Sequence, residues 1–397
     1  MSQDSVKTWG AVLLVVLAGA IATALVPQTV PVLPAIGKAF HVDGRSLSWV
    51  VSFPTLVCAL GALAFGVVVD RVGDVRLLLA GLVLVILGDA GVSLAPELHW
   101  LFAARLFQGF GYVCITVAAP TFIQRTTAGD RRRAAMAFWA AHTPVGFAAA
   151  VFFAAQLVAA GVSWRWSFGG HAIAALVIGL VALFTLRHAP TTAKVSRSAG
   201  TWQVLTSLRP YAVALGAGGA GMQQVGVMVM VPSMLTGAYG LSGPQAALAV
   251  VAAMIAVLAG AMVVVATRVR NIPLIALPIS AAVTALLGFV IVAGLVKDLP
   301  TVLTVVMLFS FGIGLANSLV WSLIPAAVPS PEAAGATAGL ITQGSFLGVL
   351  FSPPIFFWIR HESPPLIAAL AVFMTVLMVI PLYAYVRAER LGGLAAH

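Results

Sequence analysis

The sequence contains very little charge. Aspartate, glutamate, lysine and arginine together make up 8% of its 397 residues, whereas a soluble globular domain contains about 25% of these residues. Hydrophobic residues make up 61% of the chain, and its mean hydropathy is +1.08. This balance excludes an ordinary soluble enzyme or binding domain, and it supplies enough apolar sequence for about twelve membrane-spanning helices of about 20 residues each.

Cysteine is also scarce. Cys58 and Cys114 are the only two, and both lie in apolar runs without the spacing of metal ligands, so we expect buried thiols and no metal site. The sequence also lacks a glycine-rich phosphate-binding loop and a convergent set of His, Asp, Ser or Cys side chains. These absences speak against nucleotide-driven transport and against an enzyme, and no cofactor is predicted.

The apolar runs are continuous, which excludes the alternating ten-residue strands of a β-barrel and predicts an all-α membrane protein. The longest polar connector lies near the midpoint and divides the runs into six and six. The predicted domains are an N-terminal six-helix bundle at 1–187, a cytoplasmic linker at 188–208 and a C-terminal six-helix bundle at 209–397. The predicted spans are 9–36, 45–69, 76–95, 98–125, 132–160, 164–187, 209–238, 243–267, 271–295, 299–328, 332–359 and 363–387.

The net charge of +10 comes from basic residues that are scattered singly between the spans, which disfavours nucleic-acid binding. With the N-terminus inside, the predicted spans place fifteen of the 21 lysines and arginines on one side and five on the other, with Arg105 inside a span. This positive-inside pattern predicts that both termini face the cytoplasm. We expect a multi-pass protein of a bacterial inner membrane that works as a monomer in the lipid bilayer.

The two halves retain traces of an internal duplication at an offset of about 200 residues. Gly109-Phe110-Gly111 aligns with Gly312-Ile313-Gly314. Val69-Asp70-Arg71-Val72 aligns with Ala266-Thr267-Arg268-Val269, so only the first half has an aspartate at this place.

Two motifs carry a family resemblance. Gly66-x3-Asp70-Arg71-x-Gly73 lies between the second and third spans, and Arg105-x-x-Gln108-Gly109-x-Gly111 lies in the fourth. With its six plus six spans, the chain resembles the major facilitator superfamily over its whole length. The resemblance implies the major facilitator fold, in which two pseudo-symmetric six-helix bundles surround a central site.

Further residues are similar to the cyanate and nitroimidazole porter branch of that family. They are Ala118-Ala119-Pro120, Trp139, Pro144-Val145-Gly146 and Gly200-Thr201-Trp202-Gln203-Val204-Leu205.

The resemblance implies that the loop from Gly66 to Arg76 is a gate. Asp70 is expected to act as a latch anion near the start of the eleventh span, with Arg71 and Arg76 as its cationic partners, while Gly66 and Gly73 permit close packing. An exposed carboxylate gains about 0.3–1 kcal/mol from a helix N-terminus and a similar amount from an arginine. The alternative is a solvated loop whose arginines only enforce the topology.

Inside the predicted spans there are two formally charged side chains, Asp89 and Arg105. Each lies eight residues from Glu97 in the connecting turn, so both lie at the same depth and an ion pair between them is expected. The pair could be a structural bridge, or it could couple proton or anion binding to closure. Asp89, His142 and His171 are the titratable candidates for proton coupling, and His142 could equally be a packed core histidine.

In the family that the chain resembles, spans one, four, seven and ten line the pathway, so their polar side chains are candidates for binding the substrate. For each of them the alternative is a hydrogen bond between helices. The candidates are Gln28, Arg105, Gln108, Tyr112, Gln223, Gln224, Asn317 and Trp321.

One arginine with several amides and aromatic rings suits a small polar or anionic organic solute, imported by alternating access and coupled to protons. The alternative is a drug/proton antiporter for the efflux of drugs or metabolites. It is less favoured because residues 9–36 contain no acid and because 142–147 match the glycine-rich antiporter signature poorly.

Overall fold

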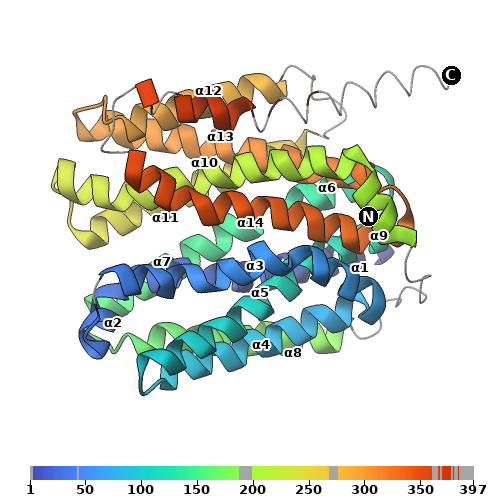
Figure 1. The fold of residues 1–397 in the computed structure, drawn as a ribbon, viewed down its shortest axis with the longest axis horizontal. Helices are drawn as coiled ribbons and strands as arrows, with labels where there is room; N and C mark the ends of the chain where they lie inside the picture. Colours follow the sequence, from blue (N-terminus) through green and yellow to red (C-terminus); the bar gives the residue numbers. More distant parts are fainter. Residues whose placement is uncertain are drawn as a thin grey trace.

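A computed structural model describes residues 3–42, 44–186, 199–267 and 276–359, with short stretches between 365 and 383. In these ranges the regular structure is helical, without a strand. The helices run side by side along the long axis of the molecule (Figure 1). We name the two ends of the molecule by the turns that lie there: the Asp70 end contains the turn after Asp70, and the Glu97 end contains the turn at Glu97.

The helices up to residue 186 form the first half of the described chain. They are α1 (Gln3–Ala24), η1 (Pro27–Thr29), α2 (Leu33–Phe40), α3 (Gly44–Val72), α4 (Asp74–Leu94), α5 (Leu98–Thr126), α6 (Gly129–Trp139), α7 (His142–Ala159) and α8 (Arg165–Leu186). The second half contains α9 (Ala199–Thr206), α10 (Leu208–Tyr239), α11 (Gly243–Ala266), α12 (Ala276–Val292), α13 (Leu299–Ala327), η3 (Pro331–Ala333) and α14 (Ala334–Ile359), and residues 369–376 are also helical.

Within the described residues, nine helical stretches are long and apolar enough to cross a membrane. They fall on the predicted spans from the second to the eighth, the tenth and the eleventh. The predicted twelfth span lies mostly outside the described residues. The predicted linker is partly helical, since α9 lies within it, and residues 187–198 are outside the described part.

Two predicted spans are interrupted, and proline accounts for both breaks. The first span divides into α1, η1 and α2, because Pro27 starts η1 and Pro34 lies in the first turn of α2. The fifth span divides into α6 and α7 at Ala140, whose carbonyl would bond to residue 144 in an unbroken helix; residue 144 is a proline and has no N–H to donate. Each break leaves carbonyl groups without a helical partner.

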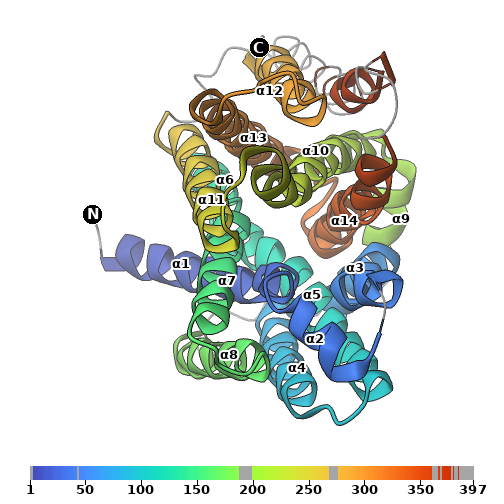
Figure 2. The same cartoon turned by 90° about the vertical axis from the view of Figure 1, so that its left-hand side faces the viewer.

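The two halves of the chain meet along two pairs of helices. α3 packs against α14, and α7 packs against α11. The end view in Figure 2 shows these pairs side by side, with α6 reaching across to α11 and α13. The first half therefore contacts the second mainly through its second and fifth predicted spans, and α5 of the fourth span adds a contact with α14.

Glycines allow the helices within each half to approach closely. Gly109 and Gly111 of α5 face α3 and α4, while Gly314 and Gly312 of α13 face α11 and α12. In both halves a pair of glycines on the fourth span therefore contacts the second and third spans, as expected from the duplication. Such small-residue contacts favour helix association in a bilayer, where the hydrophobic effect between helices is weak.

Both cysteines are buried free thiols, as the sequence predicts. In the second half, the Asp298 side chain accepts a hydrogen bond from the Thr301 N–H at 2.9 Å and so caps the start of α13. This hydrogen bonding to Thr301 lowers the pKa of the Asp298 carboxyl.

Candidate functional site

The turn between α3 and α4 brings two carboxylates beside one arginine. Asp70 lies in the last turn of α3, and its Oδ1 is 2.7 Å from Nη2 of Arg125. Asp74 begins α4, and its Oδ2 is 3.4 Å from Nη1 of Arg125. Arg125 belongs to the last turn of α5, so three helices of the first half meet in this ion-pair group.

Asp70 also binds the start of α14. Its Oδ1 accepts a hydrogen bond from the Gly335 N–H at 3.1 Å, and its Oδ2 accepts one from the Ala336 N–H at 3.2 Å. The first N–H groups of a helix have no partner within the helix, and the helix dipole favours an anion there. We call Asp70, Asp74, Arg125, Gly335 and Ala336 the Asp70 latch, and it holds the two halves together at the Asp70 end.

The cation of the latch differs from the predicted one. The sequence predicts Arg71 and Arg76 as partners of Asp70, but the structure places Arg125 against its carboxylate and leaves Arg71 and Arg76 exposed. Arg71 follows Asp70 directly on the same helix, and successive helical side chains point about 100° apart, so Arg71 faces away. The end of α5 instead reaches the same level as the latch from a neighbouring helix.

The two motif glycines serve different purposes. A Cβ atom on Gly66 would lie 2.6 Å from the Gly335 carbonyl oxygen and 3.1 Å from Cα of Gly339, so α3 and α14 touch backbone to backbone here. This is the close packing that the sequence predicts. Gly73 has open space around its Cα, but its φ is +97°, a conformation that side chains with a Cβ rarely adopt. Gly73 therefore turns the chain and does not pack closely.

Deep in the first half, Arg105 has no exposed surface, and two freed carbonyl groups fix its guanidinium. Its Nε donates to the Val50 carbonyl at 2.7 Å, which Pro54 leaves without a helical donor in α3. Its Nη1 donates to the Leu25 carbonyl at 3.0 Å, next to the break after α1. Arg105 thus supplies the N–H groups that the two irregular helices lack.

The remaining Arg105 donors bind side chains. Nη1 donates to Oε1 of Gln108 at 2.7 Å, and Nη2 donates to Oγ1 of Thr29 at 2.9 Å. The ring of Phe168 lies 5.8 Å from the guanidinium carbon. Four of the five N–H groups of the guanidinium therefore have protein partners.

Asp89 and Arg105 do not form the expected direct ion pair. They lie at the same depth, as predicted, but Gln108 lies between them and donates from Nε2 to Oδ1 of Asp89 at 2.7 Å. The physical reason is that the Val50 and Leu25 carbonyls draw the guanidinium toward α3 and α1, away from α4.

Asp89 instead pairs with His171 of α8. Its Oδ2 is 2.7 Å from Nδ1 of His171, and the Nε2 atom of Gln28 lies 3.4 Å from Oδ1. Asp89 has no exposed surface. We call this buried group the Asp89 cluster; its members are Gln28, Thr29, Asp89, Arg105, Gln108 and His171.

A cavity of about 270 Å³ lies between the two halves toward the Glu97 end. The first half contributes the Val30–Pro31 segment and one side of α7, and the second half contributes residues of α10 and α11. Every residue that lines the cavity is apolar or a glycine. They are Val30, Pro31, Phe147, Val151, Ala155, Val158, Ala159, Met228, Pro232, Gly243, Pro244, Ala247 and Val250.

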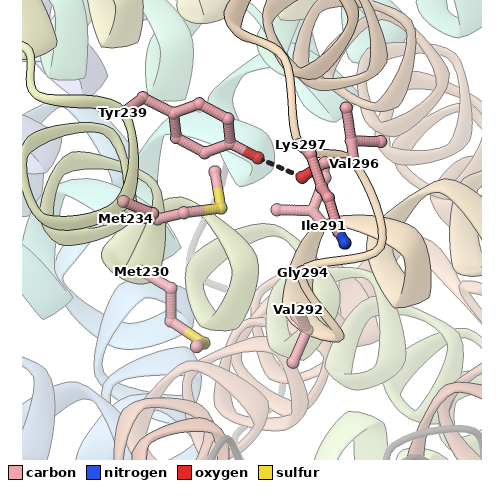
Figure 3. A pocket seen from close by; sticks show the side chains of 9 residues that line it. Met230, Met234, Tyr239, Ile291, Val292, Gly294, Val296 and Lys297 are labelled. Atoms are coloured by element: carbon pink, nitrogen blue, oxygen red, sulfur yellow. Dashed lines mark hydrogen bonds between the residues drawn. The ribbon is translucent and has the colours of Figure 1, made fainter.

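A second cavity of about 360 Å³ lies within the second half, beside the end of α10 (Figure 3). The Tyr239 hydroxyl donates to the Val296 carbonyl at its wall, and Lys297 and Met234 also line it. None of the predicted site residues lines this cavity.

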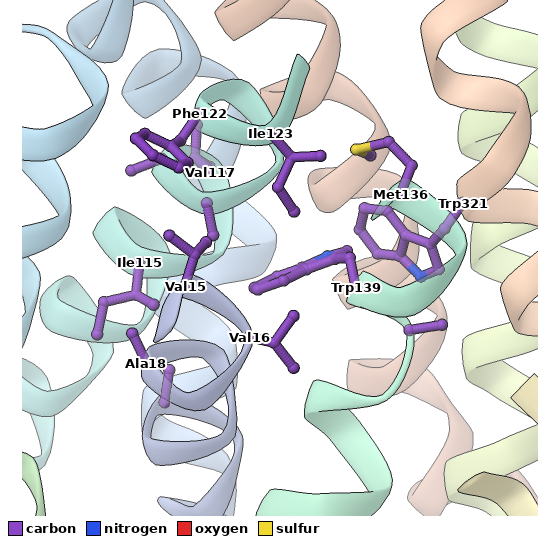
Figure 4. Close-up of a cluster of buried hydrophobic side chains, with 14 of the residues drawn as sticks. Val15, Val16, Ala18, Ile115, Val117, Phe122, Ile123, Met136, Trp139 and Trp321 are labelled. Carbon is purple, nitrogen blue, oxygen red and sulfur yellow. The ribbon is translucent and has the colours of Figure 1, made fainter. Parts of the chain in front are cut away.

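Aromatic side chains from both halves meet near the centre. Trp139 is fully buried at the end of α6, among Val15 and Val16 of α1 and Ile123 of α5 (Figure 4). His142 stacks on the Trp139 ring at 3.9 Å, with its Nδ1 2.6 Å from the Trp139 carbonyl oxygen and its Nε2 3.2 Å from the Thr143 hydroxyl.

The partner of these rings in the second half is Trp321 of α13, whose ring lies 6.2 Å from that of Trp139 and 6.4 Å from that of His142. Tyr112 of α5 meets Phe346 of α14 in the same way, edge to face at 4.9 Å. Two of the predicted substrate-binding residues, Tyr112 and Trp321, therefore lie at contacts between the halves.

The predicted amides of the second half behave differently from one another. Nδ2 of Asn317 on α13 donates to Oε1 of Gln224 on α10 at 2.7 Å. Gln223 is 1% exposed, and neither atom of its amide has a hydrogen-bond partner. The structure thus joins Gln224 with Asn317, and it groups Gln28, Arg105 and Gln108 in the Asp89 cluster of the other half.

Sequence reasoning missed the role of Arg125. The position of Arg125 at the end of the fourth span, on the same face of the membrane as the Asp70 loop, could have indicated this role. Sequence reasoning also missed that Pro54 frees the Val50 carbonyl, a signal that is readable four residues away in the sequence. Among the described residues, no group of three or more His, Cys, Asp or Glu side chains is arranged to hold a metal ion.

A family model described as Major Facilitator Superfamily matches residues 9–353. The chain belongs to the major facilitator superfamily. It is therefore a multi-pass membrane transporter and not an enzyme.

Part of this superfamily member is similar to a curated bacterial protein, the Quinolone resistance protein NorB of Staphylococcus aureus. The two are 28% identical over 175 residues in strain JH9, and the same values hold for strain Newman. The matched stretch is 44% of this chain and 37% of NorB, so the similarity spans less than half of either protein.

Solved structures of major facilitator proteins share the fold. The proton:xylose symporter XylE has a TM-score of 0.79 at 15% identity and covers 96% of both chains. The transporter FucP in its outward conformation has a TM-score of 0.75 at 13% identity, covering 96% of this chain and 99% of FucP. The human organic anion transporter MFSD10 also has a TM-score of 0.75, at 15% identity, covering 97% of this chain and all of MFSD10. At such low identities these likenesses establish the fold alone.

Proposed function

We propose that this major facilitator protein exports a small apolar or amphiphilic organic compound by alternating access, driven by a proton gradient. Two six-helix bundles, 1–187 and 209–397, would rock about the cavity between them, joined by the linker 188–208. With both termini in the cytoplasm, the Asp70 end is the cytoplasmic end. The closed Asp70 latch together with a cavity toward the Glu97 end then corresponds to an outward-facing state.

The apolar lining of the cavity between the halves is the observation that carries this choice of substrate. Cavity residues from both halves, such as Phe147 and Met228, offer no charge and no side-chain hydrogen bond. Arg105, the buried cation of the first half, is engaged by protein acceptors. A small anion would require a free cation, so these contacts favour the efflux alternative. The partial similarity to a quinolone resistance protein agrees with that preference.

The second candidate is import of a small polar or anionic solute, as in the cyanate and nitroimidazole porter branch. Gln223 favours it, because a buried amide without partners costs free energy unless a ligand or water satisfies it. The neighbouring pair Gln224 and Asn317 offers further polar groups. On this reading the predicted residues Gln28, Tyr112 and Trp321 would contribute to recognition as well.

Flux measurements in proteoliposomes with an imposed pH gradient separate the two candidates. The substrates compared are norfloxacin as a quinolone, xylose as a neutral polar solute and cyanate as a small anion. We expect norfloxacin to accumulate against its gradient and a protonophore to abolish this accumulation. Movement of cyanate or xylose without movement of norfloxacin would instead support the second candidate.

A matched pair of variants on α7 tests the cavity itself. Phe147 lines the cavity, whereas Phe152 on the same helix is 47% exposed on the outside. Phe147→Ala should lower norfloxacin flux several-fold, since it removes apolar contact area worth about 1–3 kcal/mol. Phe152→Ala should leave the flux near that of the unmodified protein. Equal effects of both variants would count against the cavity as the binding site.

A further inference from the structure

The two contacts of the His171 ring restrict which of its nitrogens carry a hydrogen. Nε2 of His171 lies 3.0 Å from the carbonyl oxygen of Ile21 in α1, and Nδ1 lies 2.7 Å from Oδ2 of Asp89. A carbonyl oxygen only accepts hydrogen bonds, so Nε2 must carry the hydrogen of that contact. The contact with Ile21 therefore identifies Nε2 as a protonated nitrogen.

The second nitrogen then requires an additional proton. A neutral imidazole has one N–H, so with Nε2 protonated its Nδ1 atom presents a lone pair. An ionised carboxylate presents only lone pairs as well, and the two would repel at 2.7 Å. The observed contact therefore contains a proton on either His171 or Asp89. The pair as a whole holds one proton more than a neutral histidine beside a carboxylate.

The surroundings of the pair supply few other charges. From α5, Gln108 donates to Oδ1 of Asp89, and Arg105 lies behind that amide as the nearest cation. From the break after α1, the Gln28 amide faces the same oxygen, and α1 itself contributes the Ile21 carbonyl. No further titratable side chain of the described residues has a hydrogen bond or ion pair with Asp89 or His171.

We infer that Asp89 and His171 together form the site at which this transporter binds its coupled proton. The inference rests on the proposed proton-driven transport and names the groups that perform the coupling. Loss of the proton leaves one N–H for two acceptors, so one of the two contacts of the ring, with Asp89 of α4 or with the Ile21 carbonyl of α1, must open. Binding of the proton restores it.

A hydrogen bond and the adjoining backbone also connect this site mechanically to the cavity wall. Ser167, one turn before His171 on α8, donates to the Gln28 carbonyl in η1 at 3.2 Å. The chain leaves η1 directly into Val30 and Pro31, which form part of the cavity wall. A movement of α8 that opens either contact of His171 therefore pulls on the segment that the substrate contacts.

His142 provides a natural control because it lacks these features. Its Nδ1 contacts the backbone carbonyl of Trp139 and its Nε2 contacts the Thr143 hydroxyl. A neutral ring satisfies both contacts, since a hydroxyl can donate as well as accept. No carboxylate forms an ion pair with His142 among the described residues, so it needs no additional proton.

Nitrogen NMR of the purified full chain in lipid nanodiscs tests proton binding without any substrate. With ¹⁵N-labelled histidine, the His171 signal is identified by its loss in His171→Gln. We expect it to show the additional proton in the unmodified chain, and to stay in the neutral Nε2–H form in Asp89→Asn at every pH. A His171 signal that is the same in the unmodified chain and in Asp89→Asn at every pH tested would overturn the inference.

Transport measurements then test coupling. Norfloxacin accumulation driven by a pH gradient should fall about tenfold or more in Asp89→Asn and His171→Gln, while counterflow without a gradient stays within about twofold. His142→Gln should retain both. Gradient-driven accumulation that survives in Asp89→Asn or His171→Gln would refute coupling at this pair. If the unmodified chain moves no norfloxacin, the proposed substrate fails, and the NMR titration still decides whether the pair binds a proton.

Discussion

The carboxylate of Asp70 lies 2.7 Å from the guanidinium of Arg125, at the junction of three helices of the first half with the start of α14. The side chains of Asp70 and Arg125 are 17% and 10% exposed, so this ion pair is shielded from solvent far more than a surface pair. Because the same carboxylate binds two backbone N–H groups of the second half, it joins the halves as well as the helices.

Asp70→Asn is expected to weaken closure of the Asp70 end. The variant loses the charge that favours Arg125 and the N-terminus of α14, and hydrogen bonds to charged groups contribute about 1.5–3 kcal/mol. The population open at the Asp70 end should therefore rise by about tenfold or more. Spin labels at the exposed positions Arg76 and Glu332, in a background without the two native cysteines, report this opening as a longer distance.

Thr267→Ala is the matched control for Asp70→Asn. Thr267 occupies the equivalent position of the second half, and its hydroxyl donates to the Val263 carbonyl of its own helix at 2.8 Å. It should leave the distance distribution unchanged. An equal shift in both variants would contradict a latch in one half only.

Arg125→Gln should destabilise the closed state more than Arg71→Gln or Arg76→Gln. Removing Arg125 leaves the carboxylates of Asp70 and Asp74 without this cation. Loss of one partner of a fully buried ion pair destabilises a folded protein by about 3–5 kcal/mol, which is the upper bound for this partly exposed group. The double variant with Asp70→Asn should be less destabilised than the sum of the single variants. Thermal unfolding of the purified chain measures both effects, and additive losses would rule out direct coupling.

Gly66→Ala should prevent full closure of the Asp70 end. Its new Cβ would lie 2.6 Å from the Gly335 carbonyl oxygen, a backbone atom that cannot move alone. Overpacking of this kind costs about 1–3 kcal/mol. On the same helix, Gly61→Ala is the control, because its Cβ would make an ordinary contact of 3.6 Å with the Phe65 ring. The spin-label distances should lengthen in the first variant and not in the second.

Gln224→Ala and Asn317→Ala test whether the amide pair of the second half contacts the substrate. Each variant removes the 2.7 Å hydrogen bond, and a neutral hydrogen bond contributes about 0.5–1.5 kcal/mol. A binding role predicts that the transport KM rises several-fold, with Ser322→Ala as a control because its hydroxyl donates to a carbonyl of its own helix. A lower Tm with an unchanged KM would show that the pair only holds α10 against α13.

Asp298→Ala should lower the Tm at neutral pH and have no effect in strong acid. The pKa of the Asp298 carboxyl is lowered by its hydrogen bonding to Thr301. A group with a lowered pKa contributes stability above its unfolded-state pKa, and this contribution is lost as the pH falls through the folded-state pKa. Asp298→Asn keeps an oxygen acceptor without a charge, so its Tm loss at neutral pH should be smaller than that of Asp298→Ala, and this loss should also shrink as the carboxyl of the unmodified chain is protonated. A pH-independent effect of Asp298→Ala would contradict the cap.

The continuous helices could be predicted from apolar length, and the broken ones could not. α4 and α8 begin and end within a few residues of the predicted spans, since the polar turn at Glu97 and the polar segment after 186 mark their ends. The break at Ala140 lies inside the predicted span 132–160, where no polar turn marks the end of a helix. Proline in a membrane helix produces either a bend or a break, and packing against neighbouring helices decides between them.

For the site, the sequence predicted which residues are buried together but not their bonds. The equal distances of Asp89 and Arg105 from Glu97 correctly placed both at one depth. Their separation by Gln108 depends on carbonyls of two other helices that compete for the guanidinium. Likewise, Arg125 becomes the latch cation through the packing of α5, which no local pattern around Asp70 records.

The interruption between α6 and α7 has a consequence for leakage. α6 contacts α13 near the Asp70 end, where the Ser318 hydroxyl donates to the Ala137 carbonyl at 3.0 Å, while α7 packs against α11 toward the other end. One interrupted span thus contacts the opposite half at both ends of the molecule. An unbroken rod would have to leave both contacts together, whereas two jointed segments can release one contact and keep the other. We expect this joint to keep one end sealed while the other opens, so that ions do not flow through the membrane during the exchange.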